Sequence, residues 1–224
     1  KFQDAILRAA QLAYDLKFQG TVILFSWPAG AEDGLINNAM ISKTYLKNKA
    51  MAARSISNAI DFFDLISRLN IKTNIYIHSM GHQVAIPALV KLSENTDIKF
   101  LVDELILNAP DYDLVEFNKI APALLKLAKH ITLYCSYNDN AMLASETLNG
   151  NKRLGACELV KGIDVINVSE IDHPSLGLGL GHSYYSSRAV LTDVAQIMMG
   201  IEVENRLFIR TSEANSKENY YLRP

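Results

Sequence analysis

Hydrophobic residues along the chain fall into two kinds of spacing, which alternate from one end to the other. Apolar residues three or four positions apart predict amphipathic helices at residues 2–17, 43–69, 82–95, 114–128, 140–148 and 184–199. Short apolar runs bounded by turn residues predict buried strands at 21–27, 74–78, 104–109, 131–137 and 164–169.

This alternation of strands and helices predicts βαβ units and a mostly parallel sheet. The strand runs are continuously apolar, which is typical of strands covered by helices on both faces. No internal repeat or linker interrupts residues 1–200, so they are predicted to form one α/β domain. Clear periodicity is lost after Gly200, and residues 201–224 are predicted to be an extension packed on that domain.

Composition and charge exclude several classes of protein. Hydrophobic residues make up 49% of the 224 and charged residues 21%, as in a globular protein with a real core. The net charge of −2 gives no field that attracts nucleic acid or an anionic membrane. No apolar run approaches the ~20 residues of a transmembrane helix.

The first residue is Lys1, which already lies in an apparent helix. We therefore expect an N-terminal portion to precede it, with which any targeting segment would be lost. The compartment and the oligomeric state stay open.

The cysteines and histidines give no sign of a cofactor. Cys135 and Cys157 are too few for a disulfide framework, and Cys135 lies in an apolar run that predicts a buried packing role. The Cys and His spacing matches no zinc motif, and no glycine-rich phosphate loop follows a strand. We therefore expect neither a metal nor an organic cofactor.

The segment IYIHSMGHQV passes from a predicted strand into a predicted helix with Ser79 at the corner. A serine in such a tight turn is typical of a nucleophile elbow, G-x-S-x-G, in which Gly81 fits and Ile77 replaces the first glycine. The backbone N–H of Met80 would then stabilise an oxyanion. The alternative is that Ser79 caps the following helix.

A nucleophilic serine needs a histidine base, which in this architecture follows the last strand. His182 ends a glycine-rich loop directly before the final helix and is favoured over His173. The alternative for His182 is a helix start without chemistry. His78 and His82 flank the serine and are predicted to have structural or rim roles, and His130 precedes a strand at the opposite edge.

The histidine in turn needs an acid between it and the serine in chain order. Asp139 follows a predicted strand within SYNDNAM and is the favoured acid. The alternative is that Asn138 or Asp139 only caps the next helix. Asp111 and Asp113 follow the preceding strand and are the alternative acids.

Five blocks of the sequence together resemble the bacterial α/β hydrolases of unknown function, which are esterase- or lipase-like. These blocks are GTVILFSWPA, IYIHSMGHQV, LILNAPDYDLVEF, ITLYCSYNDNAML and LGHSYY. The resemblance covers residues 2 to about 200. It implies an α/β-hydrolase fold with Ser79 as nucleophile, Asp139 as acid and His182 as base. It also implies that further strands and an H-G-[YF]-N-like turn, the source of a second oxyanion N–H, precede Lys1.

The expected function is therefore hydrolysis of a small-molecule carboxylic ester through an acyl-serine intermediate. Thioester or amide substrates are less favoured. The competing hypothesis is a non-catalytic binding or scaffolding protein on the same fold, since a fold does not fix a function. Ile77 in the elbow and the missing upstream turn support that alternative.

Overall fold

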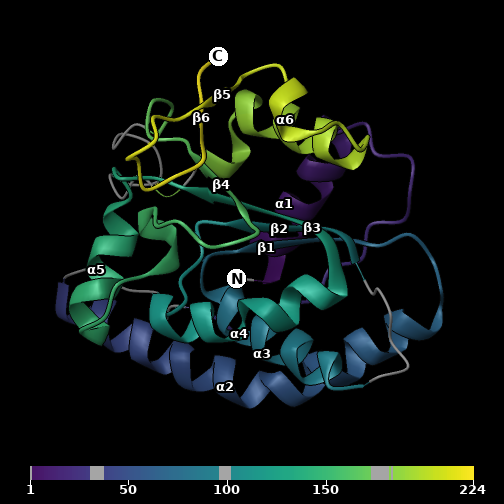
Figure 1. Ribbon diagram of the computed structural model, residues 1–224. Helices are drawn as coiled ribbons and strands as arrows, with labels where there is room; N and C mark the ends of the chain where they lie inside the picture. The colour runs from purple at the N-terminus through teal and green to yellow at the C-terminus, as the bar shows by residue number, and fades with distance from the viewer. Residues whose placement is uncertain (1, 31–37, 96–101, 173–181, 183) are drawn as a thin grey trace.

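The computed structural model describes residues 2–30, 38–95, 102–172, 182 and 184–224. Its centre is a six-stranded sheet in the order β1-β2-β3-β4-β6-β5, parallel except for β5 (Figure 1). The strands are β1 (Asn74–His78), β2 (Val102–Asn108), β3 (Ala128–Cys135), β4 (Asp164–Asn167), β5 (Ile209–Thr211) and β6 (Tyr220–Leu222). The predicted parallel α/β architecture is confirmed.

The helices agree with the predicted ones to within a few residues at their ends. They are α1 (Phe2–Asp15), α2 (Asn38–Arg68), α3 (His82–Ser93), α4 (Leu114–Leu127), α5 (Asn140–Asn149) and α6 (Arg188–Met198). In the part of the chain that the structure describes, no helix combines the length and the apolar character needed to cross a membrane.

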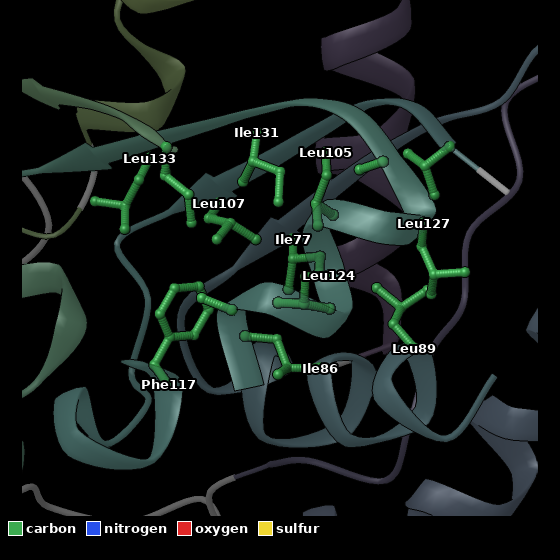
Figure 2. Close-up of a cluster of buried hydrophobic side chains, with 14 of the residues drawn as sticks. Ile77, Ile86, Leu89, Leu105, Leu107, Phe117, Leu124, Leu127, Ile131 and Leu133 are labelled. Carbon is green, nitrogen blue, oxygen red and sulfur yellow. The ribbon is translucent and has the colours of Figure 1, made fainter. Parts of the chain in front are cut away.

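Helices cover both faces of the sheet, and successive strand residues point to opposite faces. Leu105 and Leu107 of β2 pack in one core cluster with α2, α3 and α4, which Figure 2 shows in close-up. Ile106 between them belongs to a second cluster, in which it packs with Tyr134 and with Val194 of α6. Burial on both faces explains why the strands are continuously apolar.

The predicted strand at residues 21–27 is wrong. This segment has no ladder hydrogen bonds to the sheet, and its first half is exposed to solvent. Only Phe25 and Trp27 pack against the first core cluster, where the ring centroid of Phe25 lies 5.1 Å from that of Phe62. The apolar run is thus explained by contacts of two aromatic side chains rather than by strand pairing.

The C-terminal segment contributes two strands that periodicity does not predict. β6 pairs in parallel with β4, and β5 pairs antiparallel with β6. Ile209 of β5 and Leu222 of β6 are buried. Each strand has only three residues, which is too short for a pattern of alternate burial to be recognised. The segment therefore extends the sheet instead of only covering its surface.

The two cysteines form a disulfide. Cys135, at the end of β3, is bonded to Cys157, which follows the short 3₁₀ helix η2 (Leu154–Ala156). Both side chains are fully buried, so the predicted burial of Cys135 is confirmed, but its predicted role as a simple packing residue is wrong. Because the bond joins positions 22 residues apart, it closes a loop that contains all of α5.

Removal of this cross-link is expected to lower the free energy of unfolding by about 3 kcal/mol, because the unfolded chain regains the entropy of the open loop. The measurement is urea unfolding of the Cys135→Ala/Cys157→Ala double variant against the oxidised wild type. Reduced wild type is the control, since it keeps both side chains. Equal unfolding free energies for the oxidised and reduced protein would contradict a stabilising role of the bond.

Candidate active site

Strands β1, β2 and β3 end at nearly the same level of the sheet. His78 pairs with Asn108, and Asn108 pairs with Tyr134, which is the last residue but one of β3. The segments that follow these strands therefore meet at one edge of the sheet. The carboxyl ends of parallel strands are where α/β proteins build ligand sites.

The chain turns sharply at Ser79. Its φ of 52° lies in the left-handed region, which residues other than glycine rarely adopt and which is strained. A single 3₁₀ turn, η1 (Ser79–Gly81), then leads into α3. The N-cap position of α3 is Gly81, so the alternative interpretation of Ser79 as the cap of this helix is wrong.

The side chain of Ile77 fits beside the tight turn at Ser79 without a steric clash. It lies in the core cluster, beside Leu124 (Figure 2). A Cβ placed on Gly81 would lie 3.6 Å from Cγ2 of Ile77, an ordinary contact. Gly81 has φ −55°, which any residue adopts. The branched side chain is therefore accommodated, and the backbone strain falls on Ser79 rather than on Gly81.

Ser79, His182 and Asp139 lie in one hydrogen-bonded line. Nε2 of His182 is 2.8 Å from Oγ of Ser79, and Nδ1 of the same ring is 2.7 Å from Oδ2 of Asp139. Asp139 is fully buried, whereas the His182 side chain keeps 17% of its surface exposed. The three residues that the sequence analysis favoured are thus within hydrogen-bond reach, and the ring can be approached from solvent.

The two oxygens of the Asp139 carboxylate contact different neighbours. Its Oδ1 accepts a hydrogen bond of 3.0 Å from the backbone N–H of Met142 and so caps α5. Its Oδ2 faces His182. The helix-capping alternative and the acid hypothesis are therefore compatible. The cap fixes one oxygen, and this orients the other toward the ring.

The alternative acids point elsewhere. Oδ1 of the buried Asp111 lies 3.0 Å from Nε of Arg153, which is also buried, and accepts a 2.6 Å hydrogen bond from Ser145. Asp113 caps α4 through a 2.9 Å bond from the N–H of Glu116. The ion pair of Asp111 was not predicted, because a single arginine in a loop carries no recognisable pattern.

Two further histidines lie close to Ser79. His82 is fully buried, and its Nδ1 donates to the carbonyl oxygen of Ser79 at 2.6 Å. Burial lowers the pKa of His82 to about 3. Burial of the ring, followed by the nearby charge of His182, holds the pKa of His78 well below its usual range. Both rings are therefore neutral near pH 7.

His130 takes no part in this arrangement. Nδ1 of His130 lies 3.1 Å from Oε1 of Glu104, near the opposite ends of the strands. This agrees with the prediction that His130 is at the wrong edge of the sheet. His173 lies outside the described residues.

Acid is expected to destabilise the protein through His82. The unfolded chain binds a proton at this ring below about pH 6.5, whereas the folded chain does not until about pH 3. The unfolding free energy should therefore fall by about 1.4 kcal/mol per pH unit across that range because of this one group. Urea unfolding from pH 7 to pH 5 measures it.

The variant for this measurement is His82→Asn. It removes the titrating ring and should make the slope less steep than in wild type, whatever its effect on stability at pH 7. The part of the slope that comes from His78, whose pKa is also lowered by burial, should remain. A wild-type slope retained in His82→Asn would show that His82 is not the responsible group.

Met80 lies in the first turn after Ser79, where backbone N–H groups have no acceptor within the helix. The start of η1 and α3 also carries a positive partial charge. As for metals, the described residues include no group of three or more His, Cys, Asp or Glu side chains that could hold an ion.

Comparison with known proteins gives one result. The model of a family described as alpha/beta hydrolase of unknown function (DUF900) matches residues 1–200. No curated protein and no solved structure matches the chain. The match spans most of the sequence and agrees with the mostly parallel sheet and its helices. The chain therefore belongs to this family of α/β hydrolases.

Proposed function

We propose that this α/β hydrolase is a serine hydrolase that cleaves small-molecule carboxylic esters. The observation that carries the proposal is the continuous line from Ser79 Oγ through His182 to Asp139, with separations of 2.8 and 2.7 Å. A hydroxyl bonded to an imidazole that is in turn oriented by a carboxylate is the arrangement that activates a serine. The strained backbone at Ser79 supports it, since such strain concentrates at functional sites.

In the proposed reaction, Oγ of Ser79 attacks the ester carbonyl carbon while Nε2 of His182 takes the hydroxyl proton. The N–H of Met80 donates to the oxyanion that forms. The carbon–oxygen bond to the alcohol then breaks, and His182 returns the proton to the leaving alkoxide. Water, deprotonated by the same ring, then attacks the acyl carbon. The bond to Ser79 Oγ breaks, the carboxylic acid is released, and His182 returns the proton to Oγ. Asp139 stabilises the charged imidazole throughout.

A fluorophosphonate probe tests the proposal, because it forms a covalent bond only with an activated serine. We expect stoichiometric labelling of the wild type, an adduct at Ser79 in peptide mass spectra, and no labelling of Ser79→Ala. Ser93→Ala, at the far end of α3, is the matched control and should label as wild type does.

Failure to label a folded protein would sink the proposal and would favour the non-catalytic binding protein. The leaving group is tested separately with matched acyl esters, thioesters and anilides. We expect the ester to give the highest kcat/KM.

A further inference from the structure

A chain of contacts between side chains ends at the ring of His182. The ring centroid of His78 lies 5.0 Å from that of His182 and 4.2 Å from that of Tyr185. The guanidinium carbon of Arg8, from α1, is 5.0 Å from the centre of the Tyr185 ring. Residues from the first helix, from the end of β1 and from the segment before α6 are thus in contact.

His78 supports His182 through the contact between their rings, whose planes are inclined by 43°. A ring packed against the imidazole restricts its rotation, because the two side chains cannot overlap. Since His78 directly precedes Ser79, the last residue of β1 ties the position of the base to that of the serine.

The chemistry of His78 suits a support that takes no proton itself. Its Nε2 is shielded from solvent and has no hydrogen-bond partner among the described residues. A ring that stays neutral adds no positive charge beside His182 when that ring accepts a proton. Arg8 carries a charge, but it is exposed and lies over the ring of Tyr185.

We propose that His78 is a positioning residue for His182, acting through the ring packed against it. The role rests on the proposed function, in which His182 is the general base. A base must lie within hydrogen-bond reach of the proton it takes, and a misplacement of 1 Å can cost about 100-fold in rate.

The test uses His78→Ala and His78→Phe in the full chain. The alanine variant removes the ring contact and is expected to lower kcat about 100-fold with KM nearly unchanged, since binding does not depend on the base. The phenylalanine variant keeps a flat ring at the same position and should lose less, about 10-fold. A smaller loss in His78→Phe than in His78→Ala assigns the effect to the packed ring.

A spectroscopic readout separates positioning from general loss of stability. The downfield proton resonance of Nδ1–H of His182, assigned by its absence in His182→Ala, reports the bond to Asp139. We expect it to be lost or strongly broadened in His78→Ala. His82→Ala is the matched control because it removes another buried ring that contacts the Ser79 carbonyl and not His182, and it should keep the resonance.

Support requires the kcat loss and the resonance loss in folded His78→Ala together with a retained resonance in His82→Ala. Any other pattern, including equal effects of the two variants, overturns the positioning role. The resonance does not depend on turnover. If Ser79→Ala keeps the activity of the wild type, the proposed function is disproved. The resonance still tests whether His78 positions His182.

Discussion

Replacement of His182 by alanine is expected to lower kcat about 10⁶-fold, and replacement of Ser79 by alanine to do the same. The reason is that serine and imidazole act as one unit in the proposed reaction. Without the ring at 2.8 Å the hydroxyl keeps its proton, and without the hydroxyl the ring has nothing to activate. The measurement is steady-state hydrolysis of an activated ester by purified variants. Their unfolding curves must match that of the wild type, so that a loss of kcat does not reflect a loss of folded protein.

The double variant Ser79→Ala/His182→Ala provides the decisive control. Since the two residues share one step, the double variant should be no slower than either single variant. Losses that multiply would mean that the residues act independently, and the proposed proton transfer between them would have to be abandoned.

The second large effect is expected from Asp139→Asn, with a loss of about 10⁴-fold in kcat. Asparagine can still accept from the Met142 N–H through Oδ1, so the cap of α5 is kept. Its amide group would then donate to Nδ1 of His182 and place the ring proton on Nε2. In that tautomer the nitrogen facing Ser79 cannot accept a proton. The measurement compares kcat with urea unfolding of the same sample.

Asp111→Asn is the matched variant, because the same chemical change falls on the alternative acid. It breaks the buried pair with Arg153, so the expected cost is about 3–5 kcal/mol of unfolding free energy, with kcat of the folded fraction nearly unchanged. The two variants should therefore separate turnover from stability. A larger kcat loss in Asp111→Asn than in Asp139→Asn would reverse the assignment of the acid.

Elements with long and regular patterns could be predicted from the sequence. Helices such as α3 and α4 repeat their apolar positions over three turns or more, and β1 and β2 are bounded by clear turn residues. The segment 21–27 has the composition of a strand, but strand formation depends on a neighbour to pair with, which composition does not encode. β5 and β6 are too short to be recognised from their composition, but they form strands because β6 pairs with β4 and β5 pairs with β6.

For the candidate site, the order of the residues in the chain and their positions after strand ends were sufficient to predict that Ser79, Asp139 and His182 lie at one edge of the sheet. What could not be predicted are contacts between side chains that share no motif. The pair of Asp111 with Arg153 and the stack of His78 on His182 depend on how helices and loops pack in space. Neither leaves a spacing in the sequence that distinguishes it from ordinary surface or core residues.

The cross-link between Cys135 and Cys157 has a consequence for a chain that has been cut. Asp139 and the whole of α5 lie between the two cysteines, so a protease that cleaves inside this segment does not release a fragment. The half that carries Ser79 and the half that carries His182 remain one covalent molecule. Such a nicked protein would run as a single band on a gel until reductant separates the halves.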